Sequence, residues 1–362
     1  MDRQGQNGLL STFREGWRSR QASAWLIAGL LIGFYLWLYF EDRGWFPESM
    51  KLMDPAAQAV GLRNRWFLYG FLYCLAMVGG AVYYLRRHGN SRYNQIRIAV
   101  NLLVQTLLAF TLPFVMYVFT NQDFYASYLW PLKIEYLYPQ TLEHYPVYIA
   151  IYCVLAALVA TPILALTLGK RWYCSWVCGC GGLANTFGDP WRHLTSSSTR
   201  SWRFEKVTVH TVLVLAVSLT VLVAVDFFWG ASLPRYHSVV GELRSLYGLF
   251  VGAILAGVVG VGLYPLFGPR VWCRNFCPMA ALLGLTQKLG RFRIAVKPDM
   301  CISCGNCTTY CEMGIDVRAY AQENESFTRA ACVGCGMCAH VCPRGVLKLE
   351  NAPKGKSLPV VG

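Results

Sequence analysis

Six long runs of apolar residues dominate the hydropathy pattern of the chain. Each run has about the 20 residues that a helix needs to cross a bilayer, and each is apolar on all sides rather than along one stripe. Because lipid offers the backbone no hydrogen-bond partners, such runs form helices. We therefore expect an α-helical polytopic membrane protein with transmembrane helices at residues 22–40, 66–85, 98–119, 147–168, 207–229 and 246–267.

Composition agrees with this interpretation. The chain has 362 residues, of which 55% are hydrophobic and 14% are charged, whereas soluble domains carry about 25% charged residues. The net charge of +14 does not indicate a nucleic-acid partner, because Lys and Arg flank the apolar runs instead of forming a basic stripe. Their distribution between alternate loops predicts that both termini face the cytoplasm, in a bacterial inner membrane.

One cysteine pattern occurs twice after the last apolar run. The sequence reads CISCGNCTTYC from residue 301 and CVGCGMCAHVCP from residue 332. This spacing is typical of small bacterial ferredoxins with two [4Fe–4S] clusters, in which three close cysteines bind one cluster and the distant fourth binds the other. The spacing predicts cluster 1 on Cys301, Cys304, Cys307 and Cys342, and cluster 2 on Cys332, Cys335, Cys338 and Cys311.

Other uses of these cysteines fit the pattern less well. A structural zinc site would present its ligands as two separated pairs, and disulfides would need an oxidising compartment. Glycines lie between the ligands, where the backbone has to turn tightly. Glu312 occupies the place that Pro343 takes in the second copy. This difference alters local stiffness and charge and leaves the ligands intact.

An internal repeat lies at the ends of two apolar runs, where LGKRWYCSWVCG at residues 168–179 aligns with FGPRVWCRNFCP at residues 267–278. The thiolates of the two C-x3-C turns suit a third iron–sulfur cluster at the cytoplasmic face. Copper is the alternative soft metal, and reduced thiols without a metal are the third alternative. The candidate ligands are Cys174, Cys178, Cys273 and Cys277, with Cys180 as an alternative ligand.

Together these motifs resemble the polyferredoxin-type membrane iron–sulfur proteins that include NapH, NosR and CcoG. The resemblance rests on C-x3-C turns after membrane spans, followed by two ferredoxin motifs, and covers the second half of the chain to Val346. It implies quinol oxidation for a periplasmic reductase, or metal reduction during oxidase assembly. The chain departs from the family pattern at Gly179, where proline is usual, and by adding Cys180.

We therefore expect an electron-transfer subunit of a quinol-linked oxidoreductase, which passes electrons between the quinone pool and a redox partner complex. The alternative is a copper reductase that acts as an assembly factor for a respiratory enzyme. The expected partners are membrane lipid, quinone, and either further subunits or an electron-carrier protein, with no nucleic acid. All clusters are expected on the cytoplasmic side.

Two polar residues in the fifth run are candidates for function. His210 is a candidate quinone contact, although a lone membrane histidine more often joins two helices. Asp226 either has a functional role or only reaches the membrane interface. The glycines at 257, 260 and 262 lie inside the predicted sixth helix, where helix packing explains them better than nucleotide binding.

The predicted organisation has four parts. Residues 1–97 hold the N-terminal tail and two spans, and residues 98–293 hold a duplicated four-helix unit with C-x3-C turns at 174–180 and 273–277. Residues 294–350 form a small α+β domain like a bacterial two-cluster ferredoxin, and residues 351–362 form a flexible tail.

Overall fold

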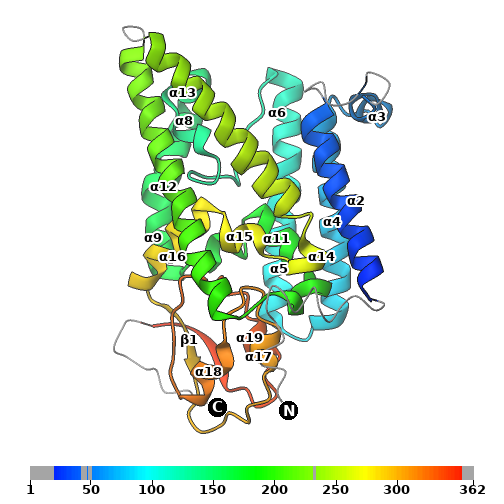
Figure 1. Cartoon of the computed structure of the whole chain (residues 1–362), viewed down its shortest axis with the longest axis vertical. Coiled ribbons are helices and arrows are strands. Elements are labelled where there is room, and N and C mark those ends of the chain that lie inside the picture. The colour runs from blue at the N-terminus through cyan, green and yellow to red at the C-terminus, as the bar shows by residue number, and fades with distance from the viewer. Residues whose placement is uncertain (1–19, 42–46, 48–50, 231–233, 353–362) are drawn as a thin grey trace. The chain divides into compact units, whose positions relative to one another are not determined.

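The computed structural model of the protein describes residues 20–41, 47, 51–230 and 234–352 (Figure 1). The chain forms two compact units, each assembled from three stretches. The first unit comprises the described residues of Met1–Tyr128 with Tyr173–Thr195 and Ala256–Val271, and the second comprises those of Leu129–Trp172, Ser196–Leu255 and Trp272–Gly362. The predicted four-part division differs from these units and stays a prediction. The predicted flexible tail lies outside the described residues from residue 353 on.

Among the described residues, six helices are long and apolar enough to cross a membrane, which agrees with the predicted number. The first two are α2 (Arg20–Phe40) and α4 (Arg65–His88). The third joins α5 (Arg92–Thr106), η3 (Leu107–Thr111) and α6 (Leu112–Thr120), and the fourth joins α8 (Val147–Leu155), η5 (Ala156–Ala160) and α9 (Thr161–Leu168). The fifth is α12 (Thr199–Trp229), and the sixth joins α13 (Pro234–Tyr247) and η8 (Gly248–Val259).

Proline accounts for the wide π-helical segments in the third and fourth spans. Pro113 and Pro162 each follow such a segment, because proline cannot donate the backbone hydrogen bond that a regular helix would need there. A threonine hydroxyl adds a bond across each widened turn. Thr161, for example, donates to the carbonyl of Ala156 at 2.7 Å, and Thr111 makes the corresponding bond in the third span.

The sixth span differs from its predicted bounds. The helix covers Arg235–Val259 rather than residues 246–267, and the short helix α14 (Tyr264–Phe267) follows after a turn. Hydropathy placed the helix too late, because its first turns carry polar residues, while the apolar residues beyond Val259 are interrupted by two glycines and Pro265. Gly257 packs against α2, as the helix-packing interpretation predicted, whereas Gly260 and Gly262 lie in the turn.

The expectation of spans that are apolar on all sides is wrong for α5. One face of this helix carries Asn94, Arg97, Asn101 and Gln105, and each of them is at most 1% exposed. Their spacing of three or four residues places them in one row along the helix. Polar side chains inside a membrane span need partners in the protein, so this face is directed at other polar groups of the first unit.

Short helices fill the space between the spans of the first unit. Helix α11 (Gly179–Asn185) contacts α4 and α5, and α14 contacts α2 and η6 (Asp189–Leu194). Helix α3 (Met53–Ala59) packs on α4. The buried core between them includes Tyr35, Leu38, Met77, Leu183 and Tyr264.

The second unit combines membrane spans with the C-terminal domain. Helices α12 and α13 run side by side (Figure 1), and η4 (Ile134–Leu137) and α7 (Pro139–His144) pack on α12. Helix α16 (Pro278–Leu289) packs on α9 and α12 and leads directly into the C-terminal domain. The arrangement joins this domain to spans of the same unit by one continuous helix.

The C-terminal domain is small and mixed, as predicted. Strand β1 (Phe292–Val296) pairs antiparallel with β2 (Leu347–Asn351), with Val296 opposite Leu347. Between them lie the short helices α17 (Asn306–Thr309), α18 (Val317–Gln322) and α19 (Met337–His340). The sheet closes the domain by bringing its two ends together.

The contact between Gly257 and α2 predicts a strong size limit at this position. A Cβ atom at Gly257 would lie 2.7 Å from the ring of Tyr39 and 2.9 Å from that of Tyr35. We expect Gly257→Leu to lower the stability of the folded protein by about 1–3 kcal/mol through overpacking, measured as a lower apparent Tm in detergent. Gly252→Leu in the same helix is the control, because nothing lies within 4 Å of a Cβ there. An equal loss in both variants would contradict this packing.

Candidate functional site

The predicted ligands of cluster 1 line one pocket of the C-terminal domain. Cys301, Cys304, Cys307 and Cys342 surround a space of about 350 Å³. Cys304 is exposed and Cys307 is buried, so this pocket opens toward solvent on the side of the first cysteines. The chain brings the distant Cys342 to the tight triplet, as the ferredoxin spacing predicts.

The predicted ligands of cluster 2 line a second pocket. Cys311, Cys332, Cys335 and Cys338 surround a space of about 390 Å³, together with Glu312 and apolar side chains. The two pockets thus divide the eight cysteines in the way that the sequence predicts. The ligand assignment itself stays a prediction.

The two cysteine motifs have the same local conformation. Helices α17 and α19 carry the third cysteine of each triplet, and each begins after a glycine with positive φ, 80° at Gly305 and 79° at Gly336. After the fourth cysteine of each copy, a backbone N–H donates to sulfur at 3.4 Å, from Ile315 to Cys311 and from Val346 to Cys342. Amide donors to sulfur are a means by which proteins tune iron–sulfur clusters.

The chemistry of these thiols fits a cluster. Burial raises the pKa of Cys307 to about 11 and the pKa values of Cys311 and Cys332 to about 12. Such thiols are protonated at neutral pH and become ligands by losing the proton when metal binds. In the described part of the chain, no three His, Cys, Asp or Glu side chains are grouped to hold a single metal ion. Four thiols arranged around each pocket are the ligand set of an iron–sulfur cluster.

The buried side-chain amide of Gln287 links the second pocket to the end of the fourth span by hydrogen bonds. Gln287 in α16 is fully buried. Its Oε1 accepts from the backbone N–H of Lys170 at 2.6 Å, and its Nε2 donates to the carbonyls of Arg329 at 2.9 Å and Cys332 at 3.0 Å. The amide therefore connects Lys170, shortly after the end of α9, with the loop that presents Cys332.

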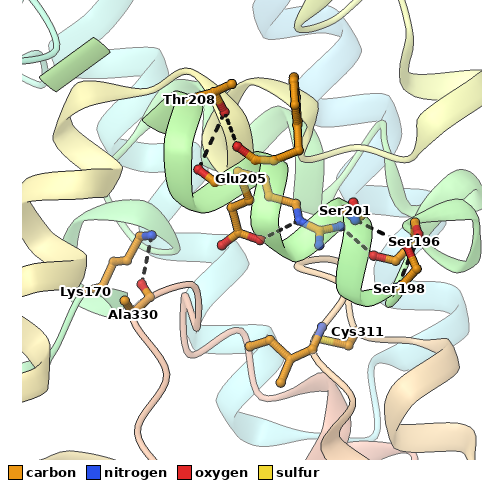
Figure 2. A network of polar contacts seen from close by, with 11 residues as sticks. Lys170, Ser196, Ser198, Ser201, Glu205, Thr208, Cys311 and Ala330 are labelled. Atoms are coloured by element: carbon orange, nitrogen blue, oxygen red, sulfur yellow. Dashed lines mark hydrogen bonds and ion pairs between the residues drawn. The ribbon is translucent and has the colours of Figure 1, made fainter. Parts of the chain in front are cut away.

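An ion pair supports the other side of the same pocket (Figure 2). The Nε of Arg274 lies 2.8 Å from Oε2 of Glu205, and its Nη1 donates to the carbonyl of Ser196 at 2.6 Å. Gly314, three residues after Cys311, packs so closely here that a side chain would collide with both the Ser196 carbonyl and the guanidinium. Arg274 thus connects α12 with the loop that follows Cys311.

The first C-x3-C turn lies in the first unit and is held by the polar face of α5. Asn101 donates to the carbonyl of Trp176 at 3.1 Å, and Gln105 donates to that of Val177 at 2.5 Å. In addition, a hydrogen bond with the side chain of Cys180 lowers the pKa of Cys178 to about 7 despite burial, with the backbone and Arg270 contributing. A thiol with this pKa is partly ionised at neutral pH, and the thiolate is the form that binds metal.

The second C-x3-C turn lies in the second unit and repeats the backbone of the first. Helices α9 and α14 end at Gly169 and Gly268, whose φ angles are 74° and 89°, and the short helices α10 (Arg171–Cys174) and α15 (Val271–Asn275) follow. Cys178 and Cys277 each precede the next helix, α11 and α16. All four predicted ligands of these turns are buried. Each turn belongs to a different unit, so a shared set of ligands stays a prediction.

The two polar residues of the fifth span have different surroundings. His210 is half-buried, and its Nδ1 lies 2.6 Å from the carbonyl of Lys206 in the same helix. Asp226 is buried, and its carboxylate lies 3.0 Å from Nδ1 of His237 in α13. Asp226 therefore joins two helices.

Sequence patterns did not reveal the residues that hold the sites in place. Lys170, Gln287 and Glu205 are polar residues beside apolar runs, and similar residues occur at every membrane boundary. A signal did exist in α5, where four polar residues recur at helical spacing. Such a row within a span predicts a buried polar contact.

Two family models match the regions that contain these cysteines. Residues 294–349 match a 4Fe-4S dicluster domain, and residues 151–195 and 249–297 match a 4Fe-4S binding domain. The chain therefore carries iron–sulfur binding domains both at the ferredoxin motifs and at the C-x3-C turns. The number of clusters stays a prediction.

Relatives share roughly half of the chain. The protein YccM of Escherichia coli, named as a candidate electron transport protein, is 30% identical over 167 residues, which are 44% of this chain and 46% of YccM. The uncharacterized protein MJ0750 of Methanocaldococcus jannaschii is 25% identical over 173 residues, which are 47% of this chain and 70% of that protein. The match thus spans about half the length of YccM. No solved structure matches the chain significantly. The NapH, NosR or CcoG type stays a prediction.

The buried ion pair beside Gly314 predicts an asymmetric response to mutation. The Arg274 and Glu205 side chains are 5% and 11% exposed, so removing one partner leaves the other charge buried. We expect Arg274→Met to destabilise the protein by about 3–5 kcal/mol, measured as a lower apparent Tm. The double variant Arg274→Met/Glu205→Gln should recover part of this loss, and the exposed Arg344→Met should have little effect. A double variant no more stable than Arg274→Met would contradict this assignment.

Proposed function

We propose that the protein carries single electrons between the quinone pool and a redox partner complex, through [4Fe–4S] clusters at the cytoplasmic face of a bacterial inner membrane. The pair of four-cysteine pockets, in a unit that also contains membrane-spanning helices, carries the proposal. The two family matches and the name of YccM support an electron-transport role. Bound [4Fe–4S] clusters supply reversible one-electron transfer.

Different residues of the C-terminal domain would bind the clusters and donate hydrogen bonds to their ligands. The four cysteines around each pocket would bind one cluster, and apolar side chains line the space between them. The backbone N–H groups of Ile315 and Val346 already point at ligand sulfurs. These donors stabilise negative charge on sulfur and so favour the reduced state.

The C-x3-C turns are proposed iron–sulfur ligand sites as well. The region that contains both turns matches an iron–sulfur binding domain, and no observation favours copper. The lowered pKa of Cys178 and the burial of the turn cysteines suit thiolate ligands.

His210 is the proposed contact for the quinone. Its Nδ1 faces the carbonyl of Lys206 at 2.6 Å, and only a protonated nitrogen can donate to a carbonyl. Nε2 is therefore the acceptor nitrogen of the neutral ring and can take a hydrogen bond, or the proton, from a quinol hydroxyl. Quinol oxidation releases two electrons and two protons. The electrons would pass one at a time to bound clusters, His210 would receive one proton, and the second proton would pass to water.

Metal analysis of the anaerobically purified full-length protein tests this proposal. We expect about eight irons and eight sulfides for the two pockets, and about twelve if the turns hold a further cluster. Cys304→Ser and Cys335→Ser should each lower the iron content by up to about four atoms, because each removes a ligand of one pocket. Cys74→Ser, in α4, is the matched control and should retain all iron.

Reduction by quinol tests the quinone link separately. We expect an EPR signal of reduced clusters on titration with a short-chain quinol, and slower reduction in His210→Phe with unchanged iron content. Full iron without reduction by any quinol would overturn the quinone link alone. Stoichiometric copper in place of iron at the turns would overturn the iron–sulfur assignment there.

A further inference from the structure

Lys170 brings a buried positive charge to the second pocket. Its side chain is only 2% exposed, although lysine is almost never fully buried unless paired. Its ammonium group donates to the carbonyl of Ala330 at 3.2 Å, two residues before Cys332 (Figure 2). A carbonyl is a neutral partner, and no carboxylate among the described residues pairs with Lys170. The positive charge of Lys170 therefore lies beside the loop that leads to Cys332 and acts on the pocket.

The position of Lys170 relative to the pocket is fixed by the backbone. Its N–H donates to Oε1 of Gln287, and the same amide donates to the carbonyl of Cys332. Gln287 is fully buried. A single side chain thus spans from Lys170 to the loop that presents Cys332, so the lysine is held at a defined place beside the pocket.

Glu312 brings the opposite charge to the same pocket. It is fully buried, follows Cys311 directly and lines the second pocket.

The first pocket has a different electrostatic environment. Of the two arginines that line it, Arg344 is exposed and Arg318 is half-buried, and Cys304 is exposed as well. Water screens exposed charges strongly. A charged side chain at the first pocket therefore acts less strongly on a cluster bound there than the buried charges act on a cluster in the second pocket.

We propose that Lys170 and Glu312 are opposed tuning charges for the cluster bound in the second pocket, with Lys170 raising and Glu312 lowering its reduction potential. The inference rests on the proposed iron–sulfur function and identifies residues that set one of its potentials. Reduction adds one negative charge to a cluster, so a fixed positive charge favours it and a fixed negative charge opposes it. Both residues act as positioned charges and not as ligands.

An EPR-monitored redox titration of the purified full-length protein tests the proposal. We expect Lys170→Met to shift the midpoint potential of one cluster downward, and Glu312→Gln to shift the potential of the same cluster upward. Lys170→Arg retains the charge and should leave the potential close to that of the wild type. Arg344→Met, which removes an exposed charge at the other pocket, should leave this cluster unchanged.

Repeating the substitution in a variant that lacks one cluster ligand identifies which cluster responds. In Cys335→Ser, which lacks a ligand of the second pocket, Lys170→Met should not shift the potential of the cluster that keeps all four ligands. A shift of that remaining cluster would place the effect at the first pocket and overturn the proposal.

Iron analysis of every variant separates the inference from the function on which it rests. Wild-type protein without iron would overturn the proposed function itself. Full iron with unchanged potentials in both Lys170→Met and Glu312→Gln would overturn only the tuning role. Lower iron in Lys170→Met, with an unchanged potential for the clusters that remain, would show that Lys170 is merely structural and would also overturn it.

Discussion

The attachment of the ferredoxin-like domain depends on the buried side chain of Gln287. Its amide has one acceptor and two donor hydrogens, and the structure uses both ends, toward Lys170 on one side and toward Arg329 and Cys332 on the other. A buried amide group without a partner costs about 1–3 kcal/mol. The side chain is therefore stable in this place only when all three hydrogen bonds are made. The domain is thereby fixed to spans of its own unit in one geometry, and electron transfer between redox centres needs fixed distances.

A similar requirement shapes the first unit. The turn around Cys178 leaves backbone carbonyls that no helix satisfies, in surroundings with little water. Asn101 and Gln105 satisfy the carbonyls of Trp176 and Val177 from within a membrane span. The polar face of α5 therefore accompanies a buried non-helical turn, whose backbone groups need protein partners in place of water.

Sequence spacing predicted the pockets well because cluster ligation is a local property of short loops. The eight ferredoxin cysteines divide between the two pockets as their spacing requires. Hydropathy also predicted six spans, but it misplaced the sixth, because apolar composition does not record where Gly260 and Pro265 end a helix. The contacts that support the pockets could not be predicted from sequence patterns. Lys170 and Ala330, for example, are 160 positions apart, and only the fold brings them together.

The internal repeat explains how one pocket is supported from two directions. Both copies keep the same backbone, and two of the positions at which their sequences differ carry a cation in only one copy: Lys170 aligns with Pro269, and Ser175 aligns with Arg274. These two cations reach the C-terminal domain from different positions of the motif. Lys170 reaches the loop before Cys332, and Arg274 contacts the loop after Cys311. Both loops present predicted ligands of the second pocket. The two copies of the repeat therefore hold the same site through different residues.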